Sequence, residues 1–174
     1  MQQSHRVGDK LIEGSALPNL SLALTGGGHL HLPADLPGRY VVLMFYRGHW
    51  CTLCRRHLSH YQANLGALDA LGIVPIAASV DDAARTRGLK TELGLTFPVG
   101  YGLTHEDVAA FDPWWGDDER GHYIQPAEFL IGADGRVIAS MYGSGAIGRM
   151  PVEGVLFAVE ARERRRLGQG EPHR

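Results

Sequence analysis

Cysteine is scarce in this 174-residue sequence, which has only Cys51 and Cys54, three positions apart. A network of structural disulfides is therefore excluded, and in a reducing compartment such a close pair indicates catalysis, redox sensing or metal binding. The sequence also has no run of 18 apolar residues, which excludes a membrane-spanning helix. Internal repeats and low-complexity segments are absent, and a chain of this length is expected to fold as one domain over residues 1–174.

The sequence has no excess of charge of either sign. Its 17 basic and 19 acidic residues give a net charge of -2, so neither a nucleic acid nor a membrane partner is expected. The first residues have no apolar core between a basic start and a small-residue cleavage site, which is unlike a secretory signal. A cytoplasmic location is therefore expected, with residues 1–15 as a loosely held lead-in.

The hydrophobic pattern predicts alternating strands and helices. Period-two alternation at 20–25 and 29–32 predicts a hairpin, and the apolar run 40–46 predicts a strand that is buried on both faces. The remaining strands are predicted at 73–80, 96–99, 127–131 and 136–142. Helices are predicted at 54–71, 82–93, 106–111 and 152–167, with residues 112–123 left as a loop.

The two cysteines lie where the buried strand gives way to a helix. Free backbone N–H groups and the helix dipole stabilise a thiolate at such a position. Cys51, the more exposed of the two, is expected to have the lower pKa and to be the nucleophile, while Cys54 resolves the mixed disulfide. Positive charge that favours the thiolate is expected nearby, from Arg47, His49, Arg55 and Arg56.

Metal binding is an alternative, because residues 49–60 contain ligand types of zinc sites, namely His49, Cys51, Cys54, His57 and His60. However, Cys54, His57 and His60 are three positions apart, so on a helix their side chains would point in successively different directions. No second Cys/His pair follows to complete a four-ligand site. An inert, buried cysteine pair is another alternative. We expect no metal or other cofactor, and we expect His57 and His60 to be solvated helix residues.

A family resemblance is carried by the segments FYRGHWCTLC, QPAEFLIGADGRV and SGAIGRM. They resemble the thioredoxin-like alkyl hydroperoxide reductase/thiol-specific antioxidant superfamily, in particular its peroxiredoxin-like branch, over about residues 8–165. The resemblance implies an α/β thioredoxin-like fold, a central mixed sheet flanked by helices, with an N-terminal β-hairpin extension. It also implies a redox enzyme that cycles a Cys51–Cys54 disulfide, with Trp50 in an apolar platform around the sulfur.

The same superfamily contains thiol peroxidases and disulfide reductases. Aligned on Cys54, the peroxidase motif would place proline at Arg47 and threonine at Cys51, and it has arginine where this chain has Pro126. Disulfide reductases have a cis proline there, facing the CxxC. The resemblance therefore implies a thiol-disulfide oxidoreductase with a cis Gln125–Pro126 bond. A thiol peroxidase acting on hydrogen peroxide or alkyl hydroperoxides is the alternative, and a metal-binding or redox-silent binding module is the third.

The implied partners are a protein or small-molecule disulfide, or a peroxide, and an external thiol reductant of the thioredoxin or glutathione type; a homodimer is compatible with the resemblance. Phe45 stands where thioredoxins have a proton-transferring aspartate, which leaves His49, Glu128 or water as proton carriers. The acidic, tryptophan-containing loop 113–122 is interpreted as a lid, a subunit contact or a loop packed on its own tryptophans. Ordinary surface roles are expected for His105 and His122.

Overall fold

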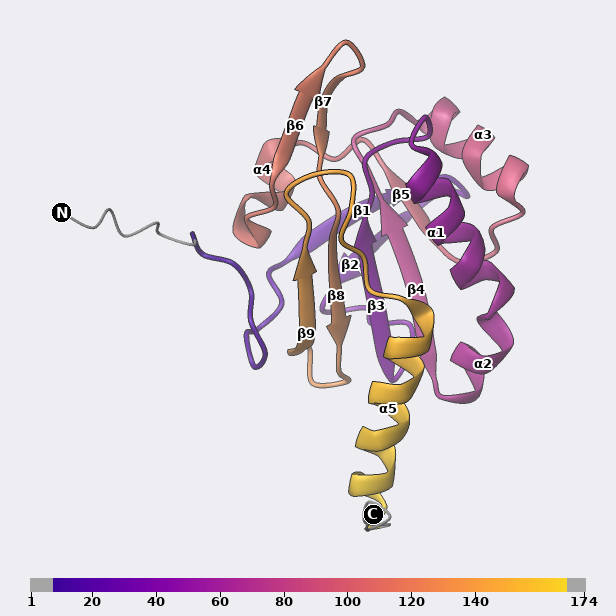
Figure 1. Cartoon of the computed structure of the whole chain (residues 1–174), viewed down its shortest axis with the longest axis vertical. Coiled ribbons are helices and arrows are strands. Elements are labelled where there is room, and N and C mark those ends of the chain that lie inside the picture. Colours follow the sequence, from indigo (N-terminus) through magenta and orange to yellow (C-terminus); the bar gives the residue numbers. More distant parts are fainter. Residues whose placement is uncertain (1–7, 169–174) are drawn as a thin grey trace, which may run out of the picture.

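A seven-stranded mixed sheet forms the centre of the computed structural model, which describes residues 8–168 (Figure 1). The order along the sheet is β2-β1-β5-β4-β3-β8-β9. The central strand β3 runs parallel to β4 and antiparallel to β8. The strands of this sheet are β1 (Leu20–Leu24), β2 (His29–Leu32), β3 (Tyr40–Phe45), β4 (Ile73–Ala78), β5 (Val99–Tyr101), β8 (Ala127–Ile131) and β9 (Val137–Tyr142).

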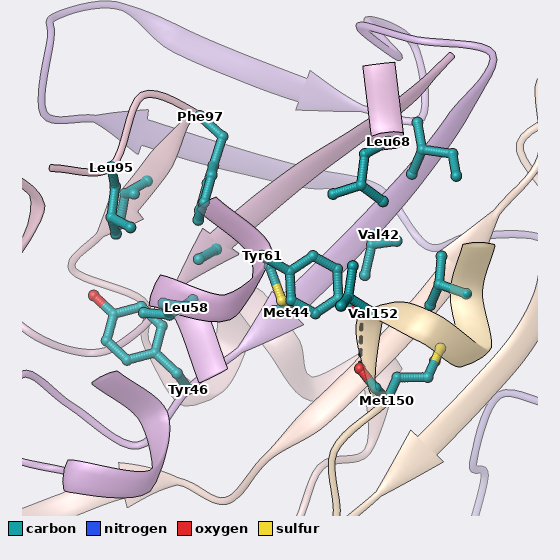
Figure 2. Close-up of a cluster of buried hydrophobic side chains, with 14 of the residues drawn as sticks. Val42, Met44, Tyr46, Leu58, Tyr61, Leu68, Leu95, Phe97, Met150 and Val152 are labelled. Carbon is teal, nitrogen blue, oxygen red and sulfur yellow. Dashed lines mark hydrogen bonds between the residues drawn. The ribbon is translucent and has the colours of Figure 1, made fainter. Parts of the chain in front are cut away.

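Helices cover both faces of the sheet. One face packs against α1 (Thr52–Ala63), α2 (Leu65–Ala70), α3 (Ala83–Leu93) and α5 (Val152–Arg166). The other face packs against α4 (His105–Val108) and the short 3-10 helix η1 (Ala109–Phe111). Strand β3 is buried on both faces, as predicted, because its alternate side chains enter the two different cores. Figure 2 shows Val42 and Met44 of this strand beside Leu58 and Tyr61 of α1.

Most of the predicted elements are confirmed, and so is the α/β thioredoxin-like fold. The N-terminal hairpin is β1 paired with β2, and the C-terminal hairpin is β8 paired with β9. Helix α3 begins after Asp82, whose side chain accepts a hydrogen bond from the Arg85 N–H (2.8 Å). It ends at Gly94, which adopts the left-handed conformation (φ 63°) that favours glycine at this place.

Two predicted boundaries are wrong. The helix predicted over 54–71 is interrupted at Asn64, which leaves the helical conformation and donates from its side chain to the His60 carbonyl (2.8 Å). The strand predicted at 96–99 begins only at Val99. Thr96 is instead bound to α1, because its N–H donates to the side-chain oxygen of Gln62 (2.8 Å).

The predicted loop 112–123 contains a second, separate hairpin, β6 (Trp115–Asp118) and β7 (Gly121–Ile124). The turn is closed by Gly121 with φ 95°, a conformation that glycine adopts without strain. Trp115 stacks on the imidazoles of His105 and His122, which also hydrogen-bond to each other. The two histidines are exposed, as expected, but they are also partners across α4 and β7. Trp115 thus packs on His105 of α4 as well as on its own hairpin, whereas Trp114 is 48% exposed.

The lead-in expected over residues 1–15 lies partly outside the described residues, which begin at Gly8. From there on it packs against the sheet rather than lying loose. The Leu11 N–H donates to the Tyr142 hydroxyl (3.0 Å), and Lys10 forms an ion pair with Asp112 (2.8 Å). Within the described range, no helix has both the length and the hydropathy needed to cross a bilayer.

Candidate functional site

The connection between β3 and α1 carries the cysteines, as predicted. Strand β3 ends at Phe45 and α1 begins at Thr52. The turn is closed by a hydrogen bond from the Cys51 N–H to the Gly48 carbonyl (3.1 Å). A Cβ atom at Gly48 would overlap the Trp50 indole, so glycine is what allows the tryptophan to fold back over the turn.

Cys51 is the N-cap residue of α1, and its sulfur accepts a hydrogen bond from the Cys54 N–H (3.3 Å). This satisfies one of the free donors of the first helical turn and places the sulfur at the positive end of the helix dipole. Both cysteines are free thiols. Cys51 is only 3% exposed and Cys54 only 1%, so Cys51 is marginally the more exposed, as expected, but both are buried beneath neighbouring side chains.

Two arginines bring positive charge to the sulfurs. Arg47, a predicted site residue, places Nη1 at 3.9 Å from the Cys51 sulfur, and its backbone N–H donates to the Cys54 sulfur (3.5 Å). Arg149 places Nη2 at 3.0 Å from the Cys54 sulfur and 3.8 Å from the Cys51 sulfur. Sequence reasoning missed Arg149, whose only signal was its place in the segment SGAIGRM.

These contacts separate the acidities of the two thiols. The Cys54 thiol donates to the Cys51 sulfur, and this hydrogen bond, together with the Cys54 N–H and Arg47, lowers the pKa of Cys51 to about 5, although burial opposes the effect. The same hydrogen bond, followed by burial, raises the pKa of Cys54. At neutral pH the pair therefore holds one thiolate, at Cys51, and one thiol, at Cys54.

The β6–β7 hairpin holds Arg47 in place. Arg47 Nη2 donates to the Tyr123 hydroxyl (3.1 Å), which in turn donates to the Asp118 carboxylate (2.9 Å). The Arg47 guanidinium also lies over the Trp50 ring at 4.9 Å, and Trp50 meets the Tyr123 ring edge to face. Trp50 is thus brought to the site, and Tyr123 is a second residue that sequence reasoning missed.

Two of the predicted basic residues, Arg55 and His49, have partners other than the cysteines. Arg55 donates to the His49 carbonyl (3.1 Å) and forms an ion pair with Glu92 (2.7 Å), so its positive charge is partly balanced by a carboxylate. His49 itself is engaged by Asp81, which accepts from its backbone N–H (2.6 Å) and lies 3.3 Å from its Nδ1. The buried Asp81 thereby fixes the orientation of the His49 ring.

The Gln125–Pro126 bond is trans, and the prediction of a cis bond is wrong; within the described chain only Leu32–Pro33 is cis. Pro126 leads directly into β8, and its carbonyl accepts the Gly143 N–H (2.8 Å). It therefore acts as a strand-leading proline that needs no backbone donor of its own at the start of the ladder. One of the features that favoured a disulfide reductase over a peroxidase, the cis proline, is therefore absent, while Arg47, Cys51 and Pro126 still stand where the peroxidase motif has proline, threonine and arginine.

A buried carboxylate lies behind the cysteines. Glu128 is 2% exposed, and its two oxygens accept hydrogen bonds from the Met150 N–H and from Nε2 of His57 (2.7 Å). The expectation that His57 is solvated is therefore wrong, because a buried carboxylate requires a partner. His60 does lie at the surface, near Glu153 (3.4 Å). Among residues 8–168, no group of three or more His, Cys, Asp or Glu side chains could hold a metal ion.

The chain is similar to known redox proteins over most of its length. The profile of the AhpC/TSA family matches residues 14–140. A peroxiredoxin from Treponema denticola is 27% identical over 154 residues, which cover 85% of this chain and 72% of the relative. A relative from Mycobacterium tuberculosis, also named as a peroxiredoxin, is 24% identical over 147 residues, covering 81% of this chain and 91% of the relative.

Solved structures share the fold. Enterococcus faecalis AhpC aligns with a TM-score of 0.76 at 16% identity, covering 94% of this chain and 99% of that protein. Reduced Prx3 from Vibrio vulnificus, in complex with hydrogen peroxide, aligns with a TM-score of 0.71 at 22% identity, covering 88% of this chain and 98% of that protein. At these identities the likeness establishes the thioredoxin-like arrangement of sheet and helices.

Proposed function

Since the chain belongs to the AhpC/TSA family and is a thiol-dependent oxidoreductase, we propose that it is a peroxidase that reduces small hydroperoxides with the Cys51 thiolate. The burial of both cysteines beneath two arginines is the observation that carries this proposal. A hydroperoxide can reach such a sulfur, because its reacting end is only two oxygen atoms wide. A protein disulfide, like a protein reductant in the closing step of the cycle, reaches the same buried atom only if the covering side chains move aside.

The chemistry follows from the two protonation states. The Cys51 thiolate attacks the distal oxygen of the hydroperoxide, the O–O bond breaks, and the departing oxygen takes up a proton to leave as water or an alcohol. The product is a sulfenic acid at Cys51. The Cys54 thiol then attacks this sulfur, forming the Cys51–Cys54 disulfide and releasing one molecule of water.

The proton for the departing oxygen has two candidate sources. Glu128, which the sequence also suggested, is already engaged by two hydrogen-bond donors as a carboxylate. This leaves water or His49, whose ring is oriented by Asp81 and is 38% exposed. Arg47 and Arg149 stabilise the thiolate and the negative charge that develops on the departing oxygen.

The cycle closes when two equivalents of an external thiol, of the thioredoxin or glutathione type, reduce the Cys51–Cys54 disulfide. A reducing compartment is required for this step, and the expected cytoplasmic location would supply one. Thiol-disulfide exchange is thus part of the same cycle. The low pKa of Cys51 also supports a second candidate function, reduction of a disulfide substrate by the dithiol form.

The deciding experiment compares the two activities on a single reduced sample. Consumption of hydrogen peroxide and of an alkyl hydroperoxide is measured beside reduction of insulin disulfides, with the same reductant in each assay. We expect peroxide consumption to exceed insulin reduction by orders of magnitude per thiol pair. Faster insulin reduction would assign the chain to the disulfide reductases instead. A Cys51→Ser/Cys54→Ser double variant gives the background of both assays.

A further inference from the structure

We propose that Glu128 and Tyr61 are positioning residues that hold the Arg149 guanidinium against the thiol pair by fixing the backbone of Met150. The hydrogen bonds of these two side chains go to Met150 and His57 rather than to a cysteine. They act on the thiols indirectly, because they fix the peptide unit of Met150 and this unit positions Arg149. The inference rests on the proposed role of the two thiols, and it holds for a peroxide or a disulfide substrate alike.

Both backbone groups of Met150 are bound by buried side chains. Its N–H donates to Oε1 of Glu128. Its carbonyl accepts from the Tyr61 hydroxyl at 2.8 Å, the bond drawn as a dashed line in Figure 2. Glu128 is 2% exposed and Tyr61 is completely buried. Met150 lies between β9 and α5, in a segment without regular secondary structure, so no sheet or helix ladder would otherwise hold it.

The position of Arg149 follows from this anchoring. The N–H of Met150 belongs to the planar peptide unit that also contains the Arg149 carbonyl, so binding it fixes the direction in which Arg149 leaves the backbone. At the far end, Arg149 Nη1 donates to the Ala146 carbonyl (2.5 Å), and Nη2 reaches the two sulfurs. A long side chain that is tied at both ends loses little further entropy when it binds the thiolate.

Glu128 also connects this segment to the helix of the cysteines. Its second oxygen accepts from His57, which lies on α1 one turn beyond Cys54. Tyr61 lies one turn further along the same helix, and its ring packs edge to face on His57. Burial and then the nearby Glu128 carboxylate raise the pKa of the Tyr61 hydroxyl, which therefore remains a donor. Helix α1 thus carries Cys54 and Tyr61 and is capped by Cys51, while Glu128 on β8 links this helix to the Met150 peptide unit.

The test measures the pKa of the nucleophilic thiol, from the pH profile of alkylation, in four single variants. Tyr61→Phe removes one hydroxyl from the Met150 carbonyl. Its matched control is Tyr142→Phe, which removes a hydroxyl that also bridges two backbone groups, the Leu11 N–H and the Phe111 carbonyl. We expect Tyr61→Phe to move the midpoint upward by about half a pH unit or more, and the control to lower only the melting temperature.

The direction in which Glu128 variants change the pKa of the nucleophilic thiol tests the proposal. Removal of a negative charge near a thiol would by itself lower its pKa, whereas loss of the Arg149 position raises it. We expect Glu128→Ala to raise the pKa of the nucleophile and Glu128→Gln, which retains an acceptor for the Met150 N–H, to restore part of the difference. A fall in the pKa with Glu128→Ala would overturn the proposal. If Glu128→Ala does not fold, the Tyr61→Phe result decides.

The last step is a double-mutant cycle with Arg149→Ala. If Tyr61 acts through Arg149, then Tyr61→Phe has no further effect on the thiol pKa once Arg149 is removed. An equal shift in both backgrounds would overturn the proposal. Alkylation needs no peroxide, so these outcomes stand apart from the peroxidase assay, and a chain that fails to reduce peroxide can still confirm or refute the positioning role.

Discussion

Nη2 of Arg149 lies 3.0 Å from the sulfur of Cys54, although 95 positions separate the two residues in the sequence. The same nitrogen lies 3.8 Å from the sulfur of Cys51, so one guanidinium spans the thiol pair. Arg47, in the turn that precedes α1, places Nη1 at 3.9 Å from the sulfur of Cys51. The electrostatic environment of the CxxC is therefore assembled from two distant parts of the chain.

Replacement of Arg149 by alanine is expected to slow the reaction of the reduced protein with hydrogen peroxide about 10- to 100-fold at pH 7. A charge-assisted hydrogen bond contributes about 1.5–3 kcal/mol, and each 1.4 kcal/mol corresponds to about a tenfold change in rate. Stopped-flow measurement of the first turnover checks this. The control is Arg136→Ala, which removes an exposed arginine bound to the Gly14 carbonyl. Equal rates in both variants would exclude a role for Arg149.

The pH dependence follows from the lowered pKa of Cys51, about 5. The thiolate is the reactive form, so alkylation should be constant above about pH 6 and fall roughly tenfold per pH unit below the pKa. The absorbance of the thiolate near 240 nm should follow the same midpoint. Because the pKa of Cys54 is raised, no second thiolate should form around neutral pH. A single midpoint near the ordinary cysteine value would contradict the geometry of the site.

The two cysteine-to-serine variants should fail at different steps of the cycle. Cys51→Ser removes the nucleophile and is expected to abolish peroxide consumption. Cys54→Ser should consume one equivalent of peroxide and then stop, leaving a sulfenic acid at Cys51 that a dimedone-type reagent traps and mass spectrometry locates. The reverse pattern, with a trapped sulfenic acid at Cys54 in the Cys51→Ser variant, would exchange the roles of the two cysteines.

Gly48→Ala tests the turn that places Trp50 beside Arg47. The added methyl group would overlap the Trp50 indole, so we expect a loss of about 1–3 kcal/mol in the free energy of unfolding and a shift in tryptophan fluorescence. Gly66→Ala is the matched control, since its Cβ meets nothing within 4 Å and the residue lies in helix α2. This variant should be neutral or more stable by up to about 1 kcal/mol. Unfolding in urea measures both.

The ends of an element could be predicted from the sequence where a single residue determines the backbone geometry. The N-cap Asp82 and the left-handed Gly94 mark the ends of α3 in the sequence as they do in the structure. The break at Asn64 has no such mark, because asparagine is tolerated inside a helix and the interruption depends on side-chain hydrogen bonds. The strands β6 and β7 have only four residues each, and β6 carries two aspartates where an alternating apolar pattern would be expected.

The candidate site also contains some residues that could be predicted from the sequence and others that could not. Cys51, Cys54, Arg47 and Trp50 lie within eight consecutive residues and could be named from sequence, because a strand-to-helix turn brings its own neighbours together. Arg149 could not be, since its place depends on how the β9–α5 connection closes over the sheet. The prediction for Pro126 failed because a proline that leads a strand has the same local sequence whether its bond is cis or trans.

The arrangement of Cys51 as N-cap and Cys54 on the first turn also affects how well the protein resists inactivation by excess peroxide. A sulfenic acid that forms at Cys51 has its resolving thiol one helical turn away, as an intramolecular neighbour at high effective molarity. We expect condensation to outpace attack by a second peroxide, which would give the irreversible sulfinic acid. Closing the disulfide requires no transport of a thiol from elsewhere in the chain, so high peroxide concentrations should saturate the protein rather than inactivate it.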